Sequence, residues 1–135
     1  MIEVLSVTKC ESELFYKARY SDSANKYSKN QQVPDYADHK KWYMENYKQG
    51  FFTVFYNGVP VGYVRINKEN IISIGILPDY QRIGIGSEVL KIISRDYNDI
   101  RCEIYENNIS SIKLFSKFPN IKITILKDLK IDDRA

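Results

Sequence analysis

Apolar residues near the amino-terminal end of the sequence recur first with the period of a strand and then with that of a helix. Residues 2–8 alternate enough between apolar and polar side chains to predict a first strand. Within residues 11–20, Phe15 and Ala18 are spaced as on one helical face, so a helix is predicted there. The polar stretch 21–34 that follows predicts a loop.

Aromatic side chains mark a second helix over residues 35–48, directly after a proline. Tyr36, His39, Tyr43 and Tyr47 recur at steps of three and four residues. This spacing places them on one face of a helix. The pattern therefore predicts a helix that presents an aromatic stripe.

The strongest local signal is a predicted β-hairpin in the middle of the chain. Two runs rich in β-branched and aromatic residues, 51–56 and 59–66, flank the dipeptide Asn-Gly at 57–58, which suits a type I′ turn. A third strand is predicted over 71–77. Pro78 closes it, because proline cannot donate to a ladder.

Four further elements are predicted in the second half of the chain: a helix over 86–97, a strand over 101–105, a helix over 108–117 and a strand over 121–126. The residues expected to face inward are Val89, Leu90, Ile93 and Tyr97 in the first helix, and Ile112 and Phe115 in the second. Taken in order, the elements predict an α/β sheet with a three-strand meander in its middle.

Composition changes this picture little. With 135 residues, 44% of them hydrophobic and 27% charged, the chain is expected to form one globular domain. A net charge of +3 is too small to indicate nucleic-acid binding, although it suits an anionic ligand.

Cysteine spacing and the absence of apolar runs bear on location. Cys10 and Cys102 have no metal or redox spacing and are expected to be reduced thiols. No apolar run approaches 18 residues, and Glu3 stands where a signal peptide would be basic. We therefore expect a cytoplasmic protein with no membrane partner.

The stretch ILPDYQRIGIGSEVLKII carries the clearest functional signal. Gly84 and Gly86 lie between a strand-like run and an amphipathic helical run. Glycines just before a helix let an anion approach backbone amides that already carry the positive end of the helix dipole. The pattern therefore favours a phosphate-binding turn.

Two common phosphate-binding motifs do not match this turn. A P-loop needs Gly-Lys-Ser/Thr, whereas Gly86 is followed by Ser87 and Glu88. A dinucleotide-binding turn needs a third glycine where Val89 stands. A purely structural role, in which Gly84 supplies a positive φ, remains an alternative.

Two longer segments resemble the GNAT superfamily of acyl-CoA N-acyltransferases. Residues 77–86 resemble its acyl-CoA-binding motif, Gln/Arg-x-x-Gly-x-Gly/Ala, and residues 104–115 resemble its second motif, which runs from a strand through Asn108 into a helix. The resemblance implies one GNAT domain over residues 1–135. It also implies the GNAT fold: a mixed central sheet with an antiparallel meander of strands 2–4, helices on both faces, and a splay between strands 4 and 5.

Acetyl-CoA is the co-substrate that this resemblance implies, and no metal is expected. The turn would hold its pyrophosphate, strand 4 would pair with its pantetheine arm, and an amide there would polarise the thioester carbonyl. Asn108 would cap its helix and touch pantetheine. The residues expected to bind the donor are Ile76, Leu77, Gln81, Arg82, Ile83, Gly84, Ile85, Gly86, Ser87, Asn108 and Phe115.

Catalysis would require a base for the acceptor amine and an acid for the leaving thiolate. Many GNAT enzymes have a tyrosine acid where this chain has Phe115, so a nearby serine (Ser110 or Ser111), another tyrosine or solvent must replace it. His39 is one expected base candidate, and Glu103 and Glu106 are the alternatives.

The expected acceptor is a primary amine of a small molecule. The segments around His39 and Trp42 and the Phe115 variant of the second motif resemble GNAT members that acetylate amino-sugar nucleotides, and Tyr36 and Trp42 would contact such a substrate. A protein N-acetyltransferase and a non-catalytic acetyl-CoA-binding module are the alternatives. A monomer or a homodimer, without nucleic acid, is expected.

Overall fold

A computed structural model describes residues 2–6, 12–20, 33–46 and 50–127 of the chain. Among the features expected from sequence, Cys10, Tyr47 and most of the loop predicted over 21–34 lie outside the described residues.

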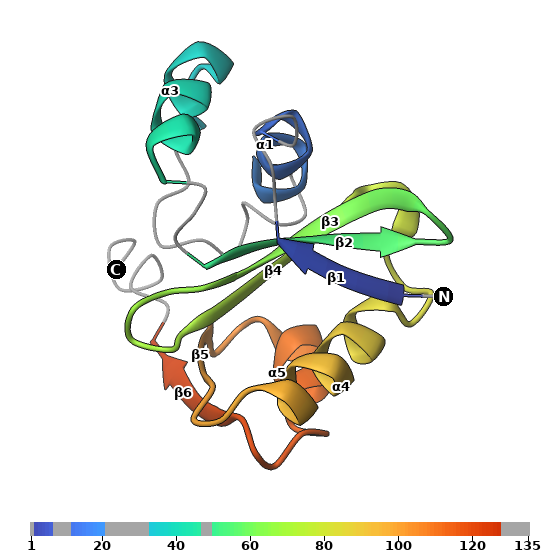
Figure 1. Ribbon diagram of the computed structural model, residues 1–135. Coiled ribbons are helices and arrows are strands. Elements are labelled where there is room, and N and C mark those ends of the chain that lie inside the picture. Colours follow the sequence, from blue (N-terminus) through green and yellow to red (C-terminus); the bar gives the residue numbers. More distant parts are fainter. Residues whose placement is uncertain (1, 7–11, 21–32, 47–49, 128–135) are drawn as a thin grey trace.

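Four antiparallel strands form the larger sheet, in the order β1-β2-β3-β4 (Figure 1). They are β1 (Ile2–Ser6), β2 (Phe51–Tyr56), β3 (Val59–Ile66) and β4 (Ile72–Ile76). Asn57 and Gly58 join β2 to β3 with φ angles of 52° and 80°. Positive φ at both positions is what a type I′ turn requires, so the predicted hairpin is confirmed.

A parallel pair of strands, β5 (Arg101–Tyr105) and β6 (Lys122–Leu126), continues beside β4. β4 and β5 are joined only at their amino-terminal ends in the described part, by a bridge between Ile71 and Arg101. Beyond that bridge the two strands separate. The splay predicted between strands 4 and 5 is therefore confirmed.

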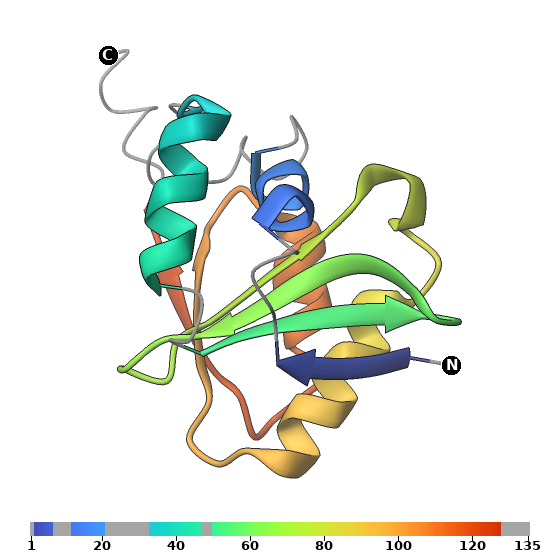
Figure 2. The same cartoon turned by 45° about the horizontal axis from the view of Figure 1, so that its top comes forward.

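Helices cover both faces of the sheet (Figures 1 and 2). α1 (Ser12–Tyr20) and α3 (Tyr36–Asn46) lie on one face, and α4 (Ile85–Asp96) and α5 (Ile109–Phe115) on the other. The predicted α/β architecture of the GNAT fold is thus confirmed. A short 3₁₀ helix, η2 (Pro78–Tyr80), follows β4 and was not predicted.

The α4 and α5 face holds the larger apolar core. Val89, Leu90 and Ile93 are almost fully buried, as the helical spacing predicts. Tyr97 was expected on the same face, but it follows the last residue of α4 and is 40% exposed. The expectation for Tyr97 was wrong because the chain becomes extended there, with φ −130° and ψ 143°.

The α1 and α3 face holds a smaller, aromatic core. Phe15, Tyr43, Phe51 and Tyr63 are buried together with Ala18. The Phe15 and Tyr63 rings meet edge to face, with centroids 4.4 Å apart. Edge-to-face aromatic contacts are favourable, and here they fix α1 and α3 to the strands below them.

Candidate active site

The turn between η2 and α4 exposes backbone amides at a helix start. Arg82 and Gly84 both have positive φ, 65° and 90°. Successive turns of this kind point neighbouring N–H groups toward one side, which forms a concave anion site. A Cβ added at Gly84 would meet nothing within 4 Å, so the space beside these amides is open. The geometry suits a pyrophosphate group.

Gly86 serves a second purpose in the same turn. A Cβ at this position would lie 3.2 Å from Leu114 Cδ2. Its absence lets the first turn of α4 approach α5, so the two glycines of the motif have different roles.

The Gln81 side chain fastens this turn to the preceding strand. Its Nε2 donates a hydrogen bond to the Ile76 carbonyl oxygen at 2.9 Å. The Tyr80 N–H also donates to the Leu77 carbonyl at 2.9 Å. The turn is therefore held in place by side-chain and backbone bonds to the end of β4.

β4 presents part of its backbone to the splay. The Leu77 N–H donates to the Val61 carbonyl at 2.8 Å, toward β3. Because hydrogen-bonding direction alternates along a strand, the N–H groups of Ile76 and Ile74 and the Ile74 carbonyl face the opposite way, whereas the Ile76 carbonyl accepts from Gln81. An extended ligand could pair with them as a strand would. Of the two predicted strand contacts, Ile76 has this orientation, whereas the Leu77 N–H is already bonded to β3.

Asn108 is an N-cap in the structure. Its Oδ1 accepts a hydrogen bond from the Ser111 N–H at 3.3 Å. Phe115 lies in the larger core and is 7% exposed. Its ring has no proton to donate, so it fills space between α5 and the sheet.

A row of polar side chains crosses the sheet on the α1 and α3 face. Arg65 on β3 pairs with Ser73 on β4, and Glu103 on β5 pairs with Thr124 on β6. The Ile71–Arg101 bridge puts Ser73 and Glu103 at equivalent positions on either side of the splay. Ser73, Glu103 and Thr124 are all exposed. Glu103 can therefore reach a substrate that approaches the splay from this face.

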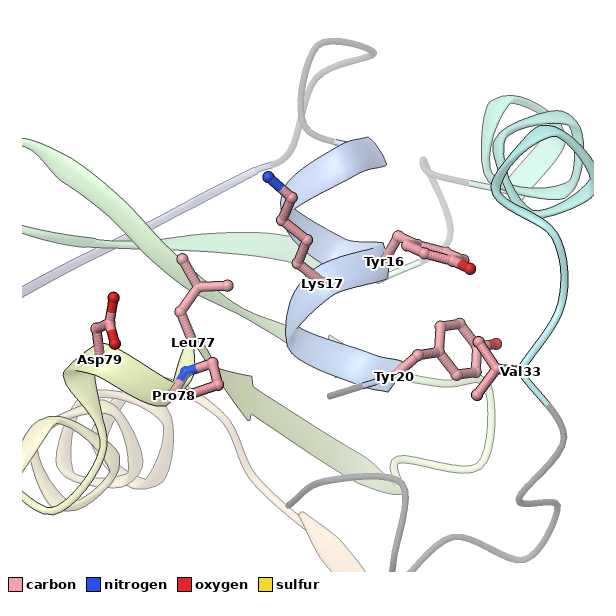
Figure 3. Close-up of a pocket in the computed structure, with 7 residues that line it drawn as sticks. All are labelled: Tyr16, Lys17, Tyr20, Val33, Leu77, Pro78 and Asp79. Carbon is pink, nitrogen blue, oxygen red and sulfur yellow. The ribbon is translucent and has the colours of Figure 1, made fainter. Parts of the chain in front are cut away.

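A pocket of about 470 Å³ lies between α1 and the end of β4 (Figure 3). Tyr16 and Tyr20 extend from α1 toward Val33, and Leu77 rises from the end of β4. The lining residues are Tyr16, Lys17, Tyr20, Val33, Leu77, Pro78 and Asp79. Aromatic rings, an ammonium and a carboxylate thus border the space beside the turn.

His39 lies behind this pocket and does not line it. It is 3% exposed and stacks on Phe15, with centroids 5.1 Å apart and planes 13° apart. The rings of Tyr16 and Tyr20, which line the pocket, have their centroids 5.0 and 5.6 Å from the centroid of the His39 ring. Its Nε2 has no hydrogen-bond partner in the described part of the chain. Burial lowers the pKa of His39, so the imidazole is neutral near pH 7.

Tyr36 and Trp42, the expected substrate contacts, lie at different places on α3. Tyr36 is 37% exposed and packs edge-on against Tyr16, next to the pocket. Trp42 is 38% exposed and lies under the Arg65 guanidinium, 5.6 Å from ring centroid to Cζ. Only Tyr36 is close to a pocket residue.

No group of three or more His, Cys, Asp or Glu side chains in the described ranges could hold a metal ion. None of the described helices is long and apolar enough to cross a membrane.

Comparison with known proteins identifies relatives of the chain. The model of the acetyltransferase (GNAT) family matches residues 16–118. An N-alpha-acetyltransferase from Sulfolobus acidocaldarius is 26% identical, over 67% of this chain and 67% of its own length.

Solved structures of low identity share the fold. A GNAT-family acetyltransferase from Bacillus anthracis superposes with a TM-score of 0.71 at 19% identity, over 87% of this chain and 78% of that one. A putative acetyltransferase from Salmonella typhimurium, solved with its cofactor acetyl-CoA, has a TM-score of 0.65 at 18% identity, over 88% and 79%.

Proposed function

Because the chain belongs to the acetyltransferase (GNAT) family, we propose that it transfers the acetyl group of acetyl-CoA to a primary amine of a small molecule, with an amino-sugar nucleotide as the favoured acceptor. The chain is an acetyl-CoA-dependent acetyltransferase by its family. The acceptor and the roles of individual residues are our proposal.

The observation that carries the proposal is the open edge of β4 beside an amide-lined turn. The Arg82–Gly86 amides would hold the pyrophosphate of the donor, and the Ile76 backbone would pair with its extended arm. Gln81 keeps these two binding elements in register through its bond to the Ile76 carbonyl. The thioester supplies an activated acetyl group.

Glu103 is the base that this arrangement favours. Its carboxylate is exposed on the face from which an acceptor can reach the splay, whereas His39 is separated from the pocket by tyrosine rings. The amine must lose a proton before its nitrogen bonds to the acetyl carbon, and Glu103 would accept that proton. The Ile76 N–H would stabilise negative charge on the carbonyl oxygen.

A proton must also reach the sulfur when the carbon–sulfur bond breaks. Phe115 cannot supply it. Ser111, in the first turn of α5, and Tyr105, at the end of β5, carry hydroxyl groups that would supply it. The proton lost by the amine nitrogen thus ends on the thiol through one of these groups or water.

Acetylation of a protein amino terminus is the second candidate function. The similarity to an N-alpha-acetyltransferase favours it. The pocket between α1 and β4, lined by rings and charges of both signs, favours a compact polar acceptor instead.

A thiol-release assay separates the two functions. Purified protein is incubated with acetyl-CoA and either amino-sugar nucleotides or short peptides, and free CoA thiol is measured. Turnover of an amino-sugar nucleotide supports the proposal. Turnover of peptides alone contradicts it and supports the second function.

The Glu103→Gln variant tests the base. We expect kcat to fall about 10²- to 10⁴-fold with the KM for acetyl-CoA little changed, because the lost group acts on the amine. Glu45→Gln, an exposed change on α3, is the matched control. Equal rates for the Glu103 variant and the wild type would exclude Glu103 as the base.

A further inference from the structure

The Arg65 guanidinium packs against two aromatic rings that themselves meet edge to face, with centroids 6.0 Å apart. Its Cζ lies 4.8 Å from the centroid of Phe51 and 5.6 Å from that of Trp42. Arg65 and Phe51 are also direct neighbours across the β2–β3 ladder. Cation–π contacts of this kind fix the plane of the guanidinium before any ligand arrives.

No acidic side chain neutralises this cation in the described part of the chain. Its guanidinium forms no ion pair or hydrogen bond with any described residue, and its buried Nε is left without a partner. A fixed, partly desolvated and unpaired guanidinium is well suited to bind an oxyanion.

A pocket of about 460 Å³ opens beside Arg65 at the β3–β4 turn. Lys68 adds a second positive charge to its lining, and Glu69 adds one negative charge. The turn itself is braced by Asn67, whose Oδ1 accepts the N–H groups of Glu69 and Ile71 at 2.9 and 3.0 Å. The remaining lining residues are Gly50, Ile66 and Asn67.

Arg65 belongs to the polar row that leads to the splay. It pairs with Ser73 on β4, and Ser73 stands level with Glu103 across the splay. One strand spacing, about 5 Å, separates Arg65 from Ser73, and the wider splay lies between Ser73 and Glu103. A substrate whose amine lies at Glu103 could thus place a second group at Arg65.

We propose that Arg65 and Lys68 form a subsite for a phosphate group of the acceptor, which lies across β4 and the splay from the amine that is acetylated. The inference rests on the proposed function in assigning this phosphate to the acceptor. The subsite itself is a binding property and can be tested without turnover. The phosphate would take its hydrogen bonds from the outer guanidinium nitrogens, since Nε is enclosed.

Trp42 provides a direct binding signal, because it is the single tryptophan of the chain and lies under Arg65. Inorganic pyrophosphate is titrated into the protein while Trp42 fluorescence is followed. We expect a saturable change that weakens about tenfold or more in Arg65→Gln, the loss typical of a charge-assisted hydrogen bond. Arg95→Gln, the same substitution at an exposed site on α4, should bind as the wild type does.

Two variants refine the test. Arg65→Lys keeps the charge but loses the planar fork, so its affinity should fall between those of the wild type and Arg65→Gln. Glu69→Gln should bind pyrophosphate about twofold more tightly, because a nearby negative charge is removed. Circular dichroism and thermal unfolding establish that each variant is folded.

Steady-state kinetics then test whether the bound phosphate belongs to the acceptor. The ratio of kcat/KM for a phosphate-bearing amine to that for an uncharged amine should fall about tenfold in Arg65→Gln. An unchanged ratio, or a fluorescence change that persists in Arg65→Gln, overturns the inference. If the protein acetylates no small amine but still binds pyrophosphate through Arg65, the proposed function fails while the subsite stands.

Discussion

At the scale of single residues, His39 shows how a titratable side chain can be part of a core. Three tyrosines, a tryptophan and a phenylalanine surround the imidazole, and the Phe15 ring stacks on it nearly in parallel. In this environment the neutral ring packs well, whereas a charged ring would lose its hydration. We therefore assign His39 to packing between α1 and α3.

Acid should destabilise the protein through His39. Burial lowers its folded-state pKa below the usual 6.5, so the unfolded chain binds the proton more readily. The contribution of His39 to the free energy of unfolding is therefore fully present above about pH 6.5. It is lost as the pH falls from that value toward the folded-state pKa, by at most about 1.4 kcal/mol per pH unit. Urea unfolding at a series of pH values from 5 to 7.5 measures this slope.

The His39→Phe variant should reduce that slope, because its ring does not titrate. Tyr36→Phe, on the same helix, should retain the wild-type slope. An identical pH dependence in His39→Phe and the wild type would show that other groups cause the acid loss.

Gln81 is a positioning residue at the same scale. Gln81→Leu removes the donor to the Ile76 carbonyl, so one of the bonds that hold the turn to the end of β4 is lost. One hydrogen bond of this kind is worth about 0.5–1.5 kcal/mol, which corresponds to a roughly two- to twelvefold rise in the KM for acetyl-CoA. Steady-state kinetics measure it, with Ser94→Ala on α4 as the control. A larger fall in kcat than rise in KM would place Gln81 at the reacting atoms instead.

Individual residues were predictable where a local rule fixes them. The left-handed Gly84 and the Asn108 cap follow from neighbouring sequence alone. The Gln81–Ile76 bond and the Arg65–Trp42 contact were not predictable, because each depends on how separate elements pack.

At the scale of elements, the strands and helices were predicted to within one or two residues where a turn or proline marks their ends. The strand 101–105 has the predicted bounds, and Pro78 closes β4 as expected. The end of α4 was misplaced at Tyr97, because an apolar side chain at helical spacing does not reveal that the backbone has become extended.

One close contact between neighbouring strands makes a sharp stability prediction. A Cβ added at Gly75 on β4 would lie 2.2 Å from Tyr63 Cε1, and Tyr63 is 4% exposed. Because the Tyr63 ring is confined by Phe15, Gly75→Ala should lower the free energy of unfolding by about 1–3 kcal/mol. Denaturant unfolding measures this loss.

A double-mutant cycle identifies the cause. In a Tyr63→Leu background the clash is relieved, so Gly75→Ala should cost less than it does in the wild type. Additive losses would instead point to a backbone effect at Gly75.

At the scale of the whole molecule, the order of elements and the two motifs were enough to predict the fold. The face proposed to receive the acceptor was less predictable, since it is built from α1, α3 and the polar row that crosses four strands. Arg65, Ser73 and Glu103 are far apart in the sequence and are brought level only by strand pairing and by the Ile71–Arg101 bridge.

Cys102 can report on opening of the whole core. It is 2% exposed, and burial raises the pKa of its thiol to about 11. Both effects suppress the reactive thiolate in the folded state, so a thiol reagent should modify Cys102 only when the core opens. The measurement uses Cys10→Ser protein, so that Cys102 is the single thiol.

Saturating acetyl-CoA should slow this labelling, because a ligand that binds only the folded state stabilises it; the expected factor is about 100 at a concentration 100 times its Kd. Fast labelling in native buffer, unaffected by acetyl-CoA, would mean that Cys102 is reached without global opening.

The open side of β4 has a consequence for the self-association of the protein. An unpaired strand is a template on which another extended chain can form hydrogen bonds, and most proteins protect such edges. In this fold the unpaired side of β4 faces the splay between β4 and β5, and the donor would pair with it as a neighbouring strand would. Protein stored without acetyl-CoA should therefore self-associate through β-pairing more readily than protein saturated with it.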